Sequence, residues 1–241
     1  MTVLLKLNGV SKFYGALKAV DTVSVDVADG EALAVIGPNG AGKTTLFNLI
    51  TGDVAPTGGR VIFAGTDMTA LPPHARSRLG IGRSYQIPHP FANMSVFENL
   101  LVGAIFGGGA SERESYKRCS DVLKVTGLHD KANVPARTLT LLQRKRLEMA
   151  RALAIQPKLL LLDEIAGGLS EYECNELVKT IKEIHGRGTT IVWIEHIVHA
   201  LISVASRLIV MNFGQLLAQG DPREVMADAR VREVYMGIPA S

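Results

Sequence analysis

The stretch GPNGAGKTT decides how the rest of this sequence is interpreted, and its residues are Gly37, Pro38, Asn39, Gly40, Ala41, Gly42, Lys43, Thr44 and Thr45. It fits the spacing G-x-x-x-x-G-K-[ST] of loops that cradle phosphate groups. The apolar run 32–36 before it predicts a strand, and the pattern over 43–51 predicts a helix. Glycines let backbone N–H groups converge on phosphate oxygens, and the start of a helix adds a dipole that favours anions.

Two side chains of this loop have specific chemical roles. Lys43 is expected to reach the β- and γ-phosphates of a nucleotide, and the Thr44 hydroxyl is expected to ligate Mg²⁺. The alternative is a chance glycine-rich turn, but such a turn has no reason to lie between a strand and a helix. The loop therefore predicts a protein that binds a nucleoside triphosphate together with Mg²⁺.

A second motif is acidic and follows an apolar run, LLLLDE at residues 159–164. A buried strand would deliver Asp163 and Glu164 to its carboxyl end, where open α/β sheets bind ligands. Asp163 suits the Mg²⁺ ion, and Glu164 suits a general base that polarises the attacking water. Adjacent carboxylates at a strand end are often only a solvated turn. The phosphate loop in the same chain favours the catalytic interpretation.

Strand and helix patterns that alternate along the chain predict an α/β fold. Strands are expected at residues 4–10, 22–27, 32–36, 60–64, 81–86, 159–163, 189–195, 207–212 and 215–218. The runs 159–163 and 189–195 are apolar throughout, as in strands buried on both faces of a parallel sheet, and a helix at 171–185 separates them. We expect a P-loop NTPase core with a mostly parallel sheet and an antiparallel β part at the N-terminus.

The interval 88–155 has a helical pattern and is predicted to be a helical subdomain inserted into a single domain of residues 1–241. One helix is expected at 95–106, ended by Gly107, Gly108 and Gly109. Ser111 with Glu114 predicts a capping box that starts the next helix. A third helix is expected at 140–155.

Composition sets limits on the function. Of 241 residues, 47% are hydrophobic and 20% charged, which is typical of a folded globular protein. The net charge of +3 gives no argument for nucleic acid as a partner. Cys119 and Cys174 have no metal or redox spacing, so reduced thiols are expected. The most apolar stretch, 191–213, contains Glu195, His196, His199 and Arg207, and is not expected to span a membrane.

The order of the remaining segments resembles an ATPase subunit of ABC transporters over nearly the whole chain. The resemblance implies that Tyr14, in KFYG, stacks on adenine, although a core tyrosine is the alternative. It implies that Gln86, in SYQ, touches Mg²⁺ and the attacking water, and couples to a membrane subunit. It implies that His196, in IEH, contacts the γ-phosphate, although a lone histidine is more often structural.

The family's signature segment LSGGQ is altered here. The corresponding residues are Leu139, Thr140, Leu141, Leu142 and Gln143. Leucines replace both glycines, whereas the basic helical run that follows matches well. The segment also fits S/T-x-x-E/Q, which predicts a capping box. The family often has Asp-Glu-Pro, and later Leu-Asp, where this chain has Ile165 and Ser170. These departures leave ATP binding intact and put the composite site of the ATPase dimer in doubt.

The stretch SYQIPHPFANMSVFENLLVGA and the closing VYMG resemble ATPases of branched-chain and hydrophobic amino-acid uptake systems. Such a subunit is expected on the cytoplasmic face of the membrane, with permease subunits, a second ATPase subunit and a substrate-binding protein as partners. A lipopolysaccharide-type exporter and a regulatory subunit with little hydrolysis are the alternatives. The transported compound, the direction of transport and the identity of the second ATPase stay open.

Two other classes of protein are less consistent with the sequence. ABC ATPases of DNA repair or chromosome maintenance carry a long coiled coil, and residues 86–139 have no sustained heptads. A P-loop kinase or GTPase would leave the helix LTLLQRKRLEMARAL unexplained, and no guanine-reading Asn-Lys-x-Asp segment is present. Phe91 and Phe97 either line the groove for the membrane subunit or pack inside the helical insertion.

Overall fold

The computed structural model describes residues 2–107 and 111–236, so the predicted contributions of Gly108, Gly109 and Gly237 lie outside the described residues. The chain divides into two compact units. One unit contains residues 1–76 and 192–241, and the other contains residues 77–191. The boundaries 88–155 of the inserted subdomain stay a prediction. Among the described residues, no helix combines the length and the apolar character needed to cross a membrane.

An antiparallel sheet forms the N-terminal part of the first unit. Its strands are β1 (Val3–Tyr14), β2 (Leu17–Ala28), β4 (Gly58–Phe63) and β5 (Thr66–Asp67), in the order β2-β1-β4-β5. Buried and exposed residues alternate along β2, as expected when one face of a sheet meets a core. The predicted antiparallel β part is therefore present, with β1 longer than the sequence suggested.

The strand before the phosphate loop lies in the same unit. β3 (Ala32–Ile36) is buried at every residue and pairs in parallel with β9 (Arg207–Asn212), which pairs antiparallel with β10 (Gln215–Gly220). The helix α1 (Lys43–Thr51) follows the loop, as predicted. This strand–loop–helix unit fixes where the loop backbone points.

A buried arginine secures the end of α1 within this unit. Arg76, on α2 (Pro73–Leu79), is 1% exposed, and its guanidinium donates to the carbonyls of Leu49 and Ile50 at 2.6 and 3.0 Å. These carbonyls belong to the last turn of α1, where a cation also meets the negative end of the helix dipole. Sequence patterns did not indicate this role for Arg76.

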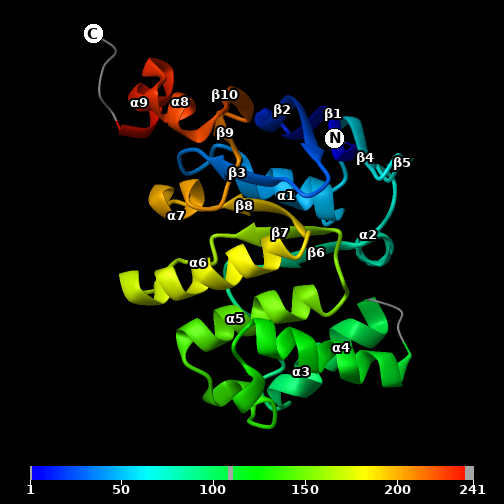
Figure 1. The fold of residues 1–241 in the computed structure, drawn as a ribbon. Helices are drawn as coiled ribbons and strands as arrows, with labels where there is room; N and C mark the ends of the chain where they lie inside the picture. The colour runs from blue at the N-terminus through cyan, green and yellow to red at the C-terminus, as the bar shows by residue number, and fades with distance from the viewer. Residues whose placement is uncertain (1, 108–110, 237–241) are drawn as a thin grey trace. The chain divides into compact units, whose positions relative to one another are not determined.

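The second unit combines two parallel strands with helices. β6 (Ile81–Ser84) pairs in parallel with β7 (Leu159–Asp163), and α6 (Glu171–Gly186) follows β7. The unit also contains three helices labelled in Figure 1, which are α3 (Val96–Val102), α4 (Glu112–Val125) and α5 (Leu141–Leu153). Its shorter turns are the π-helical η1 (Gly103–Gly107), η2 (His129–Lys131) and η3 (Ala136–Thr138). The helix expected at 95–106 therefore ends as an α-helix at Val102 and changes its hydrogen-bond pattern at Gly103.

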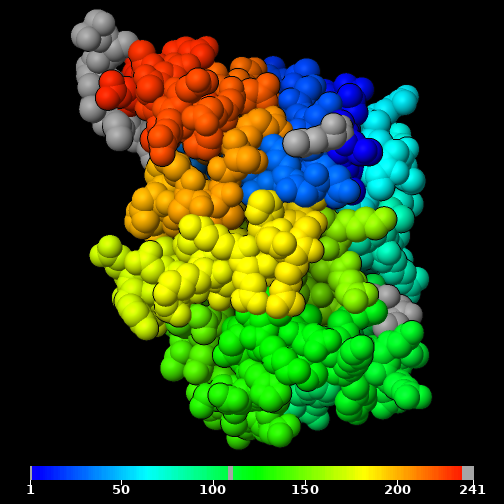
Figure 2. Space-filling view, in the orientation of Figure 1, coloured from blue at the N-terminus to red at the C-terminus, as the bar shows by residue number. Residues whose placement is uncertain are grey.

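The core of these helices is apolar. Figure 2 shows in green one face of the surface that covers it. The core includes Leu100, Cys119, Leu123, Leu147 and Ala150, each at most 1% exposed. Burial raises the pKa of the Cys119 thiol to about 11, which keeps the thiol protonated and unreactive near neutral pH.

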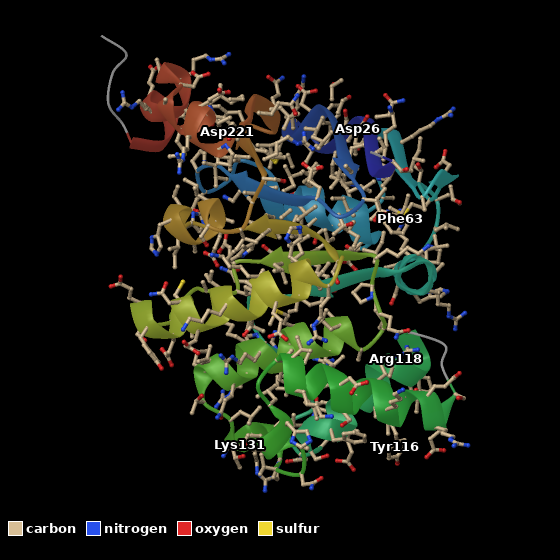
Figure 3. All side chains as sticks on the ribbon, viewed as in Figure 1. Asp26, Phe63, Tyr116, Arg118, Lys131 and Asp221 are labelled. Atoms are coloured by element: carbon tan, nitrogen blue, oxygen red, sulfur yellow. The ribbon has the colours of Figure 1, made fainter. Side chains whose placement is uncertain are left out.

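The remaining elements complete the C-terminal part of the chain. They are β8 (Thr190–Ile194), α7 (Val198–Ile202), α8 (Pro222–Ala227) and α9 (Ala229–Met236). Asp221, labelled in Figure 3, caps α8 by accepting the backbone N–H groups of Arg223 and Glu224 at 2.8 and 3.3 Å. Pro222 then occupies the first turn, where its missing N–H costs no hydrogen bond.

Candidate functional site

Two glycines of the phosphate loop have no room for a side chain. A Cβ on Gly37 would lie 2.3 Å from the Met211 carbonyl oxygen, and one on Gly42 would lie 2.1 Å from the Ala19 carbonyl oxygen. Gly42 has a φ of 97° and stands directly before α1. No side chain caps this helix start, so its first N–H groups face the loop. This is the geometry that an anion-binding loop requires.

Lys43 is held inside the loop. Its buried ammonium group donates to the carbonyl oxygens of Gly37 and Pro38 at 2.8 and 3.1 Å. These main-chain contacts hold the cation within the loop. The next residue, Thr44, is exposed. The expected contacts of both side chains with phosphate and Mg²⁺ stay predictions.

Tyr14 is the last residue of β1 and 49% of its side chain is exposed. The ammonium of Lys12 lies 5.1 Å from the centroid of its ring and also donates to the carbonyl of Ala55 at 2.9 Å. The ring is thus fixed by a cation while remaining accessible. A buried core tyrosine, the alternative considered from sequence, does not describe this position.

The acidic strand end lies in the second unit. Asp163 is the last residue of β7 and accepts a 2.7 Å hydrogen bond from Arg83, on the neighbouring strand β6. Glu164 follows, and its carboxylate accepts a 2.5 Å hydrogen bond from the side-chain amide of Gln86. Each of the two residues was expected to act on the attacking water, and the fold brings their side chains into contact.

The backbone at Glu164 is strained. Its φ is 46°, in the left-handed region that residues with a side chain rarely adopt. Such a conformation costs on the order of 1 kcal/mol or more and clusters at functional sites. The strain turns the chain after β7, so that Asp163 is buried whereas Glu164 is half-buried.

Sequence reasoning missed Lys145, which connects the signature helix to Gln86. Lys145 lies on α5, is 4% exposed, and donates to the Gln86 carbonyl at 2.6 Å. A buried lysine requires a partner, because an unpaired charge in a protein interior is costly. The available signal was a lysine on the apolar face of the predicted helix. Its partner could not be identified from the sequence.

The altered signature segment starts α5 with the predicted capping box. The Thr140 hydroxyl accepts the Gln143 N–H at 3.4 Å, and the Gln143 side chain accepts the Thr140 N–H at 3.0 Å. Leu139 is buried and Leu141 is exposed. A Cβ on Gly168 would lie 3.3 Å from Cδ2 of Leu141, so this side chain leans against the loop before α6. The leucines therefore do not disturb the start of the helix.

His196 lies in the first unit, two residues after β8, and is exposed. Its backbone N–H donates to the carboxylate of the buried Glu195 at 2.9 Å. This contact fixes the main chain from which the imidazole projects. The position is compatible with a role toward phosphate, and that role stays a prediction.

The two phenylalanines after Gln86 have different environments. Phe97 packs against the helical core, and its ring centroid lies 5.2 Å from that of Tyr116, which points outward from α4 in Figure 3. Phe91 is 45% exposed, and the guanidinium of Arg151 lies 5.2 Å from the centroid of its ring. Phe97 therefore packs inside the helical insertion, which was one of the two alternatives. Phe91 remains accessible to a partner, which was the other.

The predicted metal ligands are hard oxygen donors: the Thr44 hydroxyl, the Gln86 amide oxygen and the Asp163 carboxylate. Over residues 2–107 and 111–236, no cluster of three or more His, Cys, Asp or Glu side chains could hold a metal ion. Mg²⁺ is usually bound by one or two carboxylates plus substrate phosphates rather than by an all-protein cage. Each of these oxygens is of the kind that Mg²⁺ prefers, and their assembly around one ion stays a prediction.

Known proteins similar to this chain are ATP-binding proteins of transporters, and the matches cover nearly its whole length. A family model described as ABC transporter matches residues 20–167, and one described as branched-chain amino acid ATP-binding cassette transporter matches residues 215–240. The high-affinity branched-chain amino acid transport ATP-binding protein LivG of Salmonella typhimurium is 36% identical, with 97% of this chain and 98% of the relative covered. The lipopolysaccharide export system ATP-binding protein LptB of Acidithiobacillus ferridurans is 35% identical, with 98% of each covered.

Solved structures similar to this chain are also ATP-binding cassettes of ABC transporters. The ADP conformation of an ATP-binding cassette of an ABC transporter is 32% identical and superposes with a TM-score of 0.91, covering 99% of this chain and 100% of the other. A dimeric cassette in a post-hydrolysis state, bound to ADP and Pi, is 26% identical with a TM-score of 0.81, covering 91% and 99%. The expected fold, with its antiparallel N-terminal sheet and parallel strands, is confirmed. The chain belongs to the ABC transporter family and is the ATP-binding subunit of such a transporter.

Proposed function

We propose that this subunit hydrolyses ATP with Mg²⁺ and thereby drives transport through membrane subunits. The contact between Gln86 and Glu164 carries the proposal. A glutamine amide that touches the strained carboxylate after β7 forms the pair needed to position and polarise a water molecule. A subunit that only held ATP would have no need of this pair.

The predicted side chains divide binding and catalysis between them, and Gln86 takes part in both. Tyr14 stacks on adenine, and the loop Gly37–Thr45 binds the phosphates through its N–H groups and Lys43. Thr44, Gln86 and Asp163 supply oxygens to Mg²⁺, which neutralises charge on the β- and γ-phosphates when bound. Glu164 accepts the proton of the attacking water, and His196 contacts the γ-phosphate.

The test of hydrolysis is Glu164→Gln. This variant keeps the shape of the side chain and loses its basicity, so ATP binding should persist and turnover should fall by about 10²- to 10⁴-fold, or roughly 3 to 5 kcal/mol of barrier. Lys43→Ala is the matched control and should weaken ATP binding itself. Near-normal turnover in Glu164→Gln would refute the assignment of the general base.

The signature segment supports a second ATPase subunit as a partner. Leu139, Thr140, Leu141, Leu142 and Gln143 are proposed to face the nucleotide of the opposite subunit. The uncharged capping box at Thr140 leaves the positive end of α5 suited to a phosphate. Glu164→Gln should therefore accumulate as an ATP-bound dimer, measurable by light scattering with ATP and with ADP.

Amino-acid uptake is the proposed transport reaction, at the cytoplasmic face of the membrane. Sequence identity to LivG and to LptB is nearly equal, so identity alone does not separate uptake from export. The match of residues 215–240 to the branched-chain amino acid cassette model supports uptake. Expression with candidate permeases and a substrate-binding protein separates the two functions. ATP-dependent leucine uptake into proteoliposomes supports the proposal, and stimulation of ATPase activity only by a lipopolysaccharide-type permease contradicts it.

A further inference from the structure

A buried ion pair joins two neighbouring strands of the second unit. Arg83 lies on β6 and Asp163 ends β7, and the parallel pairing of these strands brings both residues to the same edge. The distance from Nη2 of Arg83 to Oδ2 of Asp163 is 2.7 Å, with the side chains 5% and 4% exposed. The ring of Tyr85 lies over the guanidinium, 4.7 Å from its carbon to the ring centroid. An arginine in this position is fixed on two sides.

The pair changes the charge of the acidic strand end. Asp163 and Glu164 are consecutive carboxylates, and two carboxylates at one strand end attract divalent cations. Arg83 contributes one positive charge in contact with Asp163, in surroundings where water screens it poorly. A cation that approaches Asp163 must therefore overcome repulsion from the guanidinium. The phosphates of a nucleotide offset that repulsion, because they supply both negative charge and oxygen ligands.

We propose that Arg83 is a positioning residue that orients Asp163 and makes divalent-metal binding depend on nucleotide. The inference rests on the proposed role of Asp163 toward Mg²⁺. Arg83 holds the carboxylate in one orientation through a charge-assisted hydrogen bond. The same charge keeps the site from binding metal alone, so the metal binds only together with ATP.

The test is a titration of the nucleotide-free protein with Mn²⁺. Binding is measured from the electron paramagnetic resonance signal of the Mn²⁺ that stays free in solution. Arg83→Met removes the charge and keeps much of the length, so Mn²⁺ should bind about tenfold or more tightly than to the wild type. Arg83→Lys keeps the charge and should stay within about threefold of the wild type. Arg83→Met with Asp163→Asn should lose the gain, because the gain requires the carboxylate.

A stability measurement supplies a second readout that activity does not affect. Thermal unfolding in EDTA should show a lower midpoint for Arg83→Met, because Asp163 loses its guanidinium partner in a buried position. Added Mn²⁺ should raise that midpoint by more than it raises that of the wild type. If Arg83→Met fails to fold, Arg83→Gln, which retains an N–H donor, takes its place with the same expected shift in affinity.

The outcomes separate this inference from the proposed function. A folded Arg83→Met or Arg83→Gln that binds Mn²⁺ alone no more tightly than the wild type overturns the role of Arg83. Mn²⁺ affinity is also measured for the wild type mixed with ATP and for ATP alone. Equal affinities in these two samples overturn the metal role of Asp163. Loss of ATP hydrolysis is measured separately and leaves the nucleotide-free titration unaffected.

Discussion

Four helices among the described residues begin with a capping box, and one of them differs from the others in charge. The boxes of α3, α4 and α6 pair a serine with a glutamate, namely Ser95 with Glu98, Ser111 with Glu114 and Ser170 with Glu173. The box of α5 pairs Thr140 with Gln143, and the first turn of α5 contains no acidic residue. The reciprocal backbone hydrogen bonds of the box are present in all four helices. In the three acidic boxes the serine hydroxyl also donates to the glutamate, and only these boxes carry a charge.

The difference lies at the positive end of the helix dipole. A glutamate in the first turn places a full negative charge beside the N–H groups and compensates their field. The glutamine of α5 closes the same box without that charge, so the positive field remains. The three acidic boxes stabilise helices, whereas the neutral box also leaves a start that suits an anion. This contrast agrees with the proposed contact between residues 139–143 and a phosphate.

Among changes to the capping boxes, the largest effect is expected from Gln143→Glu, which gives α5 the charge of the other three boxes. The helix should remain folded, because glutamate serves the box at least as well. A new negative charge near the γ-phosphate should lower ATPase activity of the assembled transporter by roughly ten- to a hundredfold. The measurement is turnover with membrane subunits present. Unchanged turnover would show that the start of α5 does not face phosphate.

The matched control is the reverse change on a helix with no proposed role in binding. Glu114→Gln gives α4 the uncharged box of α5. It should leave turnover within about twofold, because surface substitutions away from a site have small effects. A loss as large as that of Gln143→Glu would point to a general effect on folding.

A smaller effect is expected from removing the cap itself. Thr140→Ala and Ser111→Ala should each lower the free energy of unfolding by about 1 kcal/mol, the usual contribution of an N-cap. Only Thr140→Ala should also lower turnover, by several-fold, because it loosens the start that is proposed to face phosphate. Chemical denaturation and turnover measured on both variants separate the two effects. Equal turnover in the two variants would contradict a special role for Thr140.

The pH response should distinguish the acidic boxes from the neutral one. The pKa values of Glu98, Glu114 and Glu173 lie below their ordinary 4.5, because each carboxylate accepts hydrogen bonds from its serine. The main cause is the backbone N–H for Glu98 and Glu173, and the hydroxyl for Glu114. A depressed pKa adds stability above about pH 4.5 that disappears as the pH falls through the folded-state value.

NMR measurement of carboxyl shifts against pH tests this expectation. The backbone N–H groups in the first turns of α3, α4 and α6 should lose protection from hydrogen exchange in acid. Those in the first turn of α5 should not respond. Gln143→Glu should acquire a new titration with a low pKa. An ordinary pKa in that variant would mean that the box of α5 has a different geometry from the other three.

Local patterns allowed much of the fold to be predicted, because they depend on neighbours in the chain. The phosphate loop, the strand before it and the boxes at Ser111 and Thr140 were all recognised from spacing. Arg83 and Lys145 were not, because their partners lie 80 and 59 residues away. Which carboxylate or carbonyl a buried cation meets depends on strand register and helix packing, and neither follows from spacing along the chain.

The smallest effect is expected from Leu142→Gly, which restores glycine at a signature position. In the family that glycine lets the backbone approach phosphate closely. Here Leu142 is half-buried and Leu141 leans against Gly168, while the box at Thr140 keeps its hydrogen bonds. The main-chain donors are retained, so turnover in the assembled transporter should change by less than about threefold, given the usual size of a tolerated substitution. A rise of about a hundredfold or more, equivalent to roughly 2.8 kcal/mol of barrier, would mean that the leucine blocks this site. The working site would then be built with a different partner ATPase.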